Sequence, residues 1–173
     1  CDAATVYNST QGTDHGTIQG ALDAAGPGNI VQVGAGVYAE SLTISQSVSL
    51  VGSDADTTSI TGGIILSGSF DGLTLHGLTL TGDGPGPEDA IIDMTNVEEG
   101  TVGDVTMTEC ILDGESDGKR AFFGRNLTGT WTWDGNELKN FASAEVVLNT
   151  ASGEELDHKL EHVVFTNNLS MNM

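Results

Sequence analysis

Basic residues are scarce in this 173-residue chain. It has 5 Lys and Arg against 25 Asp and Glu, which gives a formal net charge of −20 at pH 7. Nucleic acid is excluded as a partner, because proteins gain affinity for it through Lys and Arg that neutralise phosphates. An anionic membrane surface is excluded for the same reason. Regularly spaced Ile, Leu and Val argue against charge-driven disorder. We therefore expect a folded protein with a carboxylate-rich surface, from a high-salt setting or from a cold or marine secreted source.

Proline, aromatic residues and long apolar runs are also few. The chain has 3 Pro and 5% aromatic residues, whereas Gly is abundant at 24 copies. No stretch is long or apolar enough to span a bilayer, so we expect no transmembrane segment. No signal-peptide pattern stands at the N-terminus, and any such peptide is expected to have been removed. Many Gly, Thr and Ser between short apolar runs predict brief strands joined by tight turns.

There are two cysteines. Cys110 lies in an apolar strand pattern and is expected to pack as a small hydrophobic side chain. Cys1 is the residue that cleavage of a bacterial-type lipoprotein signal leaves at the N-terminus, so a lipid anchor there is one interpretation. A disulfide between Cys1 and Cys110, or an arbitrary chain boundary, are the alternatives.

A repeat runs along the chain. Each copy has an apolar, a polar and an apolar residue, then a two-residue turn and a second short strand. The copies are LTLHGLTLTG (73–82), VTMTECILDG (105–114), WTWDGNELKN (131–140) and VVFTNNLSMN (163–172), with LTISQSVSLVG (42–52) as an earlier form. A further strand precedes each pair, and we expect these strands to form one column. They are residues 30–33, 58–61, 90–93, 121–124 and 145–148.

Three short strands per repeat describe one coil of a parallel β-helix. The sequence predicts an all-β, right-handed, single-stranded parallel β-helix of about five three-strand coils in one domain, 1–173. The N-terminal segment would be 1–16, a short capping helix 17–28 and the coils 29–173. Trp131 and Trp133 are expected in the core, as are Leu73, Leu75, Val105, Met107, Leu112, Val163 and Phe165. Thr43, Thr74, Thr106 and Thr132 are expected to form one outward column.

The opening of the chain resembles the pectin-lyase-like right-handed parallel β-helix family. The residues that carry this resemblance are TIQGALDAAGPGNIVQVGAGVYAESLTISQSVSLVG (17–52), with a G-x-Y-x-E turn, and TTSITGG (57–63). The lyase, galacturonase and esterase motifs of the family are absent, so the resemblance implies a non-catalytic or divergent member. The fold hosts many activities and therefore does not decide the function.

The family's working surface is the outside of the first strand of each coil and the turns beside it. Four turns, 52–57, 82–89, 114–120 and 140–144, are expected to stack along one edge. Their carboxylates are candidate ligands for Ca²⁺, which prefers six to eight oxygens, and solvated loop acids are the alternative. These acids are Asp54, Asp56, Asp83, Glu88, Asp89 and Asp117.

Two classes of function remain. The first is a non-enzymatic secreted or cell-surface module, with a ligand-binding surface at Asp89, Asp93, Lys119, Arg120 and Arg125. Its partner would be a polysaccharide or another protein chain. The protein chain would bind at the C-terminal coil, for which the sequence shows no cap, and a second copy of the same chain would give a homo-oligomer. The second class is a polysaccharide lyase or hydrolase, or a fragment of one. Its catalytic candidates are Asp93, Arg120, Arg125 and Glu145.

Overall fold

The fold was analysed in a computed structural model of the chain. The structure describes residues 5–82, 89–94, 101–115, 120–125, 127–141, 146–149 and 160–171. Within them it contains one helix, α1 (Ile18–Ala24), and three β-sheets that carry all the strands.

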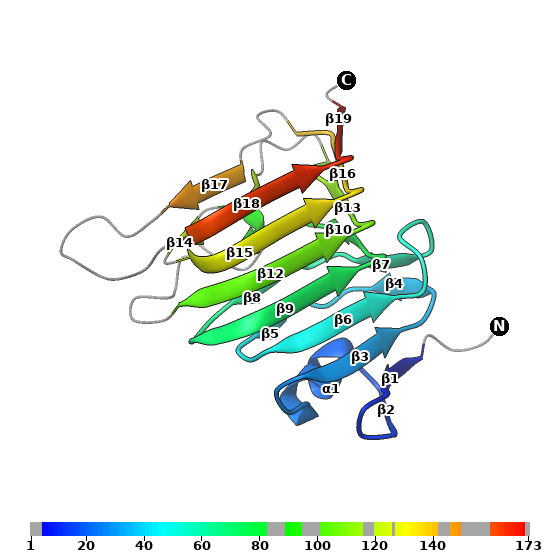
Figure 1. Cartoon of the computed structure of the whole chain (residues 1–173). Helices are drawn as coiled ribbons and strands as arrows, with labels where there is room; N and C mark the ends of the chain where they lie inside the picture. The colour runs from blue at the N-terminus through cyan, green and yellow to red at the C-terminus, as the bar shows by residue number, and fades with distance from the viewer. Residues whose placement is uncertain are drawn as a thin grey trace.

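The strands are distributed over the three sheets in a repeating order (Figure 1). Sheet A contains β1 (Val6–Asn8), β2 (Thr13–His15), β3 (Asn29–Val33), β6 (Val48–Gly52), β9 (Phe70–His76), β12 (Val102–Thr108), β15 (Leu127–Asp134) and β18 (Leu160–Thr166). Sheet B contains β4 (Gly36–Tyr38), β7 (Thr58–Ile60), β10 (Thr79–Thr81), β13 (Ile111–Asp113), β16 (Glu137–Lys139) and β19 (Leu169–Met171). Sheet C contains β5 (Leu42–Ile44), β8 (Ile64–Leu66), β11 (Ala90–Asp93), β14 (Arg120–Arg125) and β17 (Val146–Asn149).

From β3 onward the chain passes through sheets A, B and C in turn, and its last pass covers β18 and β19. The strands from β3 onward pair in parallel with the strand one pass earlier and the strand one pass later. The predicted parallel pairing between 73–80 and 105–112 is confirmed, because Leu73 lies in register with Val105 and Leu80 with Leu112. The result is an all-β, solenoid-like arrangement of three parallel sheets.

The predicted column of first strands is wrong. Residues 30–33 belong to sheet A and residues 58–60 to sheet B, whereas β11, β14 and β17 belong to sheet C. All these segments are short runs rich in apolar residues, so the pattern identifies strands without indicating their sheet.

The predicted threonine column is correct only in part. Thr74, Thr106 and Thr132 are in register on sheet A. Thr43 lies on β5 of sheet C and pairs with Ile65. Its place in the sheet A column is taken by Ser49, which is in register with Thr74.

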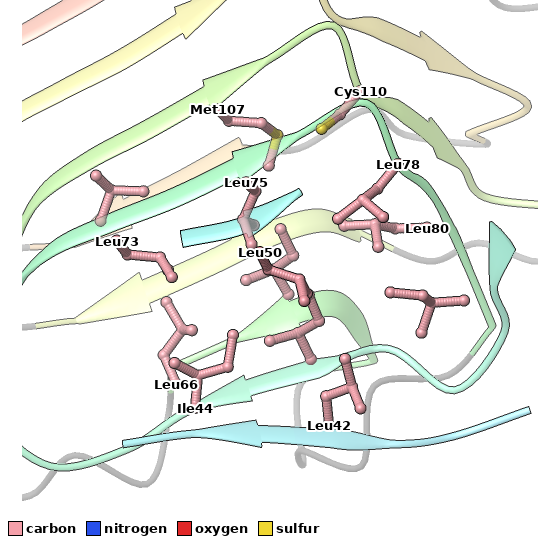
Figure 2. Packing of buried hydrophobic residues seen from close by; sticks show 14 of the residues in the cluster. Leu42, Ile44, Leu50, Leu66, Leu73, Leu75, Leu78, Leu80, Met107 and Cys110 are labelled. Carbon is pink, nitrogen blue, oxygen red and sulfur yellow. The ribbon is translucent and has the colours of Figure 1, made fainter. Parts of the chain in front are cut away.

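Apolar side chains from all three sheets fill the interior. Figure 2 shows Leu50, Leu73, Leu75 and Met107 of sheet A with Leu42, Ile44 and Leu66 of sheet C and Leu80 of sheet B. These side chains are almost completely buried, as expected from strands that place alternate residues inside. Trp131 and Trp133 are buried, as predicted, and each packs edge-on against Phe122 of sheet C.

A stack of side-chain amides runs inside the turns between sheets A and B. Asn136 is buried, accepts a hydrogen bond from Cys110 N and donates to Met107 O. Asn168 repeats this arrangement one pass later: it accepts from Asn136 N and donates to Trp133 O. The predicted correspondence of Cys110, Asn136 and Asn168 is therefore confirmed. Each amide links two successive passes of the chain.

Helix α1 covers the core at the N-terminal end (Figure 1). It begins after Thr17, whose hydroxyl accepts from Gly20 N as an N-cap. Ile18, Ala21 and Leu22 are buried, as their helical spacing predicts. The helix is shorter than the predicted 17–28 because Ala25 is already extended, ahead of Gly26 and Pro27.

Side chains from the first pass complete the N-terminal end. The carboxylate of Glu40 accepts from both Ile18 N and Gln19 N at 3.0 Å. The amide of Gln19 pairs with the backbone of Thr43, accepting from its N–H and donating to its carbonyl, and so occupies part of the free edge of sheet C. Strands β1 and β2 extend sheet A beyond β3 with antiparallel pairing. This end is thus covered by a helix, a hairpin and side-chain caps.

Candidate functional site

The candidate surface on sheet C is built around Asp93. Ile92 points into the core, so its neighbour Asp93 lies on the other face of β11, in register with Ile65 on β8 and Phe123 on β14. The Asp93 residue is only 1% exposed. A carboxyl group buried on the outer face of a sheet is unusual, because burying an ionised carboxylate costs free energy unless other groups compensate it.

Phe123 of β14 is in register with Asp93, and Arg120 begins the same strand. The guanidinium carbon of Arg120 is 5.3 Å from the centroid of the Phe123 ring, which is cation–π geometry. The backbone N–H of Arg120 donates to the carbonyl of Asp89 at 3.0 Å. The structure therefore brings Asp89, Asp93 and Arg120 together on two neighbouring strands of sheet C.

The other predicted residues of this surface are only partly described. Arg125 ends β14, and its backbone is in register with Asn149. Lys119 and Glu145 lie outside the described residues. Phe123 was not among the predicted site residues. Its position at the outward point of the alternation in AFFG (121–124) would have indicated it.

The predicted acidic edge is wrong in its arrangement. Asp54 and Asp56 lie in the turn from β6 to β7, between sheets A and B, and the Asp54 carboxylate accepts from Asp56 N. Asp89 directly precedes β11, between sheets B and C. Asp83, Glu88 and Asp117 lie outside the described residues. Among the described residues, no group of three or more His, Cys, Asp or Glu could hold a metal ion. Calcium binding stays a prediction.

A second candidate surface is the C-terminal end (Figure 1). Strand β18 is the edge of sheet A and β19 is the edge of sheet B. Val163 and Phe165 are in register with the buried Trp131 and Trp133, so they belong to the inward-facing positions. They were predicted to be buried, but Val163 is 38% and Phe165 50% exposed. The reason is that β15 covers these side chains from one side only.

Two more apolar side chains are exposed at this end. Val164, on the outer face of sheet A, is 38% exposed and Leu169 is 53% exposed. Leu169 is in register with Glu137, on the outer face of sheet B, and it is exposed as predicted. Its neighbour in the chain, Ser170, is in register with Leu138, which packs on the core.

The core beneath this end contains a buried donor without a partner. Trp133 packs at 5.6 Å from the Phe165 ring, with the two planes tilted by 45°. In the described part of the chain, Trp133 Nε1 and Thr58 Oγ1 are the buried side-chain polar atoms that have no hydrogen-bond partner. A buried N–H that makes no hydrogen bond costs about 1–3 kcal/mol.

The C-terminal end also differs from the rest of the chain in charge. Of the 25 acidic residues, Glu161 is the one that falls within residues 160–171. On the preceding pass, Asp134 accepts hydrogen bonds from Thr166 and Asn167, which lower the pKa of its carboxyl group and tie the last pass to the body. The described residues of the last pass, 160–171, therefore carry one acidic residue in a chain of net charge −20.

The chain was compared with known proteins and searched for membrane-spanning helices. No protein-family model matches the sequence, and no curated protein or solved structure matches it. In the described residues, no helix has the length and hydropathy needed to cross a membrane.

Proposed function

We propose that this chain is a right-handed parallel β-helix, a divergent relative of the pectin-lyase-like proteins. We propose that it serves as a non-enzymatic binding module, secreted or displayed at the cell surface, that docks another protein at its C-terminal end. Right-handedness is the form that parallel crossover connections almost always take. The order A, B, C on every pass and the resemblance over residues 17–82 support this fold.

The difference between the two ends carries the proposal. The N-terminal end has α1, the β1–β2 hairpin and the caps from Glu40 and Gln19. The C-terminal end presents edge strands and the exposed side chains of Val163, Phe165 and Leu169. Free sheet edges with apolar side chains pair readily with other chains, and natural proteins normally cover or charge them. The apolar side chains exposed on β18 and β19 fit a docking surface.

Docking of a strand to β18 would combine two kinds of contact. The backbone of β18 would form ladder hydrogen bonds with the incoming strand, as in β-strand addition. Val163 and Phe165 would be covered, and burying one such side chain fully is worth about 1.5–3 kcal/mol. An acceptor on the partner could also satisfy Trp133 Nε1.

A strand peptide tests the proposal without knowledge of the natural partner. The probe is a synthetic peptide with the sequence of residues 160–171, titrated by thermophoresis onto labelled chain at nanomolar concentration. We expect saturable binding and slower hydrogen exchange in β18. Phe165→Asp should weaken binding by at least about tenfold, the effect of about 1.4 kcal/mol. Val37→Asp is the control, because Val37 is an exposed apolar residue on the N-terminal pass, 75% exposed against 50% for Phe165. No binding, or binding that Phe165→Asp leaves unchanged, would contradict the proposal.

A second candidate function is favoured by the surface on sheet C. Ligand sites combine aromatic side chains with a few charged or polar groups, and a sugar suits such a site. Here the buried Asp93 lies one strand away from Phe123, on which Arg120 is stacked. An acidic polysaccharide lyase or hydrolase would use Asp93 and Arg120. Incubation with oligogalacturonides, read by absorbance of unsaturated products and by reducing ends, tests this candidate. Activity that Asp93→Asn abolishes would support it, and no turnover would exclude it for this substrate class.

The location outside the cell is part of the proposal. The acidic composition fits an extracellular protein in concentrated salt.

A further inference from the structure

We propose that a hollow on the outer face of sheet A, near the N-terminal end of the molecule, binds a ring of a neutral sugar. The hollow has a volume of about 350 Å³, and its lining includes Thr5, Tyr7, Gln32, Gly34, Val51 and Ser53. Sites for small molecules begin at about 300 Å³, so this hollow suits a ligand of the size of a monosaccharide. The inference goes beyond the proposed function, because the site involves neither β18 nor sheet C.

Three neighbouring strands place side chains on this face. Tyr7 of β1 is in register with Gln32 of β3, and Gln32 is in register with Val51 of β6. The residues that precede them in the chain are buried in the core: Val6, Val31 and Leu50. Because successive residues of a strand point to opposite faces, Tyr7, Gln32 and Val51 lie side by side on the outer face. Figure 1 shows β1, β3 and β6 at the N-terminal end of the sheet.

The next row of residues along these strands has a glycine at its centre. Gly34 N donates to Thr5 O at 2.8 Å, and Ser53 N donates to Val33 O at 2.9 Å, so Thr5, Gly34 and Ser53 continue the pairing of the three strands. A Cβ atom at position 34 would lie 3.2 Å from Thr5 O, which is closer than ordinary van der Waals contact. Glycine at this position therefore leaves space between two side chains that carry hydroxyl groups.

The lining combines an aromatic ring with uncharged hydrogen-bonding groups. Neither the hydroxyl of Tyr7 nor the side-chain amide of Gln32 makes a hydrogen bond to the described residues, so both can bind a ligand. Ser53 Oγ donates to Val33 O at 3.2 Å and keeps its lone pairs as acceptors. A sugar ring offers C–H groups to the apolar face of an aromatic ring and hydroxyls to amides and hydroxyls. The described residues that line the hollow carry no charge, which matches a neutral ring.

Charges outside the hollow disfavour an anionic sugar. Asp14 of β2 is in register with Tyr7, on the side away from Gln32, and Asp54 directly follows Ser53 in the chain. Together with the net charge of −20, these carboxylates repel a uronate. The expected ligand therefore differs from the acidic polysaccharide considered for the surface on sheet C.

The test is a titration of isotopically labelled chain with methyl β-glucopyranoside, methyl β-galactopyranoside and methyl α-mannopyranoside, followed by the chemical shifts of backbone amides. Gly34 and Gly52 line the hollow, and their amide signals report binding there. We expect saturable shifts of these two signals with at least one of the sugars, with a dissociation constant of roughly 1 mM for so small a ligand. Methyl α-galacturonide and glycerol, at the same concentrations, should leave both signals unchanged.

Variants locate the bound sugar. Tyr7→Ala should raise the dissociation constant at least about tenfold, and Tyr7→Phe, which keeps the ring, should raise it less. Val51→Phe should prevent binding by filling the hollow, while the strand preference of Phe at this outward position leaves β6 intact. Thr106→Ala changes an outward residue of sheet A outside the lining and should bind as the unaltered chain does. Circular dichroism checks the folding of each variant.

The outcomes decide the inference independently of the docking function. Shifts at Gly34 and Gly52 that Val51→Phe abolishes support a sugar site in the hollow. The inference is overturned if none of the three neutral sugars shifts these signals, or if the shifts persist in folded Val51→Phe chain. Binding of the galacturonide or of glycerol as strongly as a neutral sugar overturns it as well. The strand peptide of the docking test binds at β18, so failure of either site leaves the other standing.

Discussion

Glu40 and Gln19 show how single side chains join elements that are distant in the sequence. The Glu40 carboxylate accepts the first free N–H groups of α1, which no intrahelical carbonyl can satisfy. At the C-terminal end of α1, the side-chain amide of Gln46 donates hydrogen bonds to the carbonyls of Leu22 and Ala25. The residues of the G-x-Y-x-E turn and its surroundings thus hold the helix on the first pass of the chain.

Removing the Glu40 carboxylate should destabilise the N-terminal end. Glu40→Ala leaves Ile18 N and Gln19 N without their acceptor, and losing a side-chain cap costs about 1–2 kcal/mol. Urea unfolding should show a lower free energy of unfolding, while the slope of that free energy against urea concentration stays unchanged. Glu40→Gln keeps one acceptor oxygen and should lose less. Equal stability of all three chains would mean that the cap contributes nothing.

Cys110 is predicted to be an inert thiol in the folded protein. Burial raises its pKa to about 11, despite backbone hydrogen bonds that lower it. Because the folded pKa lies above the unfolded one, of about 8.5–9, the protonated thiol favours folding below that value and this contribution is lost as pH rises toward 11. In a Cys1→Ser background, Ellman's reagent at pH 8.5 should react slowly until urea is added.

The same argument gives a pH dependence for stability. Between pH 9 and about 11, the stability of the Cys1→Ser chain should fall more steeply than that of a Cys1→Ser, Cys110→Ser chain. Tyr and Lys titrate in both chains and cancel in the comparison. Identical slopes would mean that the thiol ionises as easily in the folded protein as in the unfolded one.

At the scale of elements, the short strands could be located from the sequence, but not all their neighbours. The segments 73–82, 105–114 and 131–140 were aligned correctly, because each joins a sheet A strand to a sheet B strand across a two-residue turn. The segments 30–33 and 58–61 were placed in the wrong column, since turns of unequal length separate them. The candidate site shows the same limit: Asp93 and Arg120 lie on the paired strands β11 and β14, whereas Asp54 and Asp56 lie between sheets A and B.

Outside the apolar core, substitutions in the asparagine stack should lower the free energy of unfolding most. Asn136→Ala leaves Cys110 N and Met107 O without partners in the interior, and each unsatisfied group costs about 1–3 kcal/mol. We expect a loss of about 2–4 kcal/mol in urea unfolding. Thr132→Ala, on the outer face of the neighbouring strand, is the control and should change stability by less than about 0.5 kcal/mol. A small effect of Asn136→Ala would show that water replaces the amide.

At the scale of the whole molecule, net charge sets how the protein responds to its solvent. With 25 acidic and 5 basic residues, repulsion among the carboxylates opposes the compact state. Ion pairs within 4.0 Å join Lys139 with Asp113 and, when His76 is protonated, His76 with Glu109. Such partly exposed pairs offset little of this repulsion.

Stability should therefore rise with salt. Increasing NaCl from about 0.1 M to 2 M shortens the Debye length from roughly 10 Å to about 2 Å, which screens the repulsion among carboxylates. Thermal melts in the Phe165→Asp chain separate this effect from any association at β18. The melting temperature is expected to increase across the range, and a flat or falling curve would count against the high-salt interpretation.

The sequence by itself determined the class of the protein: short parallel strands, a cap of one helix at the N-terminus, a buried Trp131 and Trp133, and an acidic exterior. These follow from local alternation, helical spacing and composition, which each segment carries alone. The tertiary structure decided which strands share a sheet and that Asp93 is buried in register with Phe123. These depend on the number of residues in every intervening turn and on the coverage that neighbouring passes provide, and no single segment contains that information.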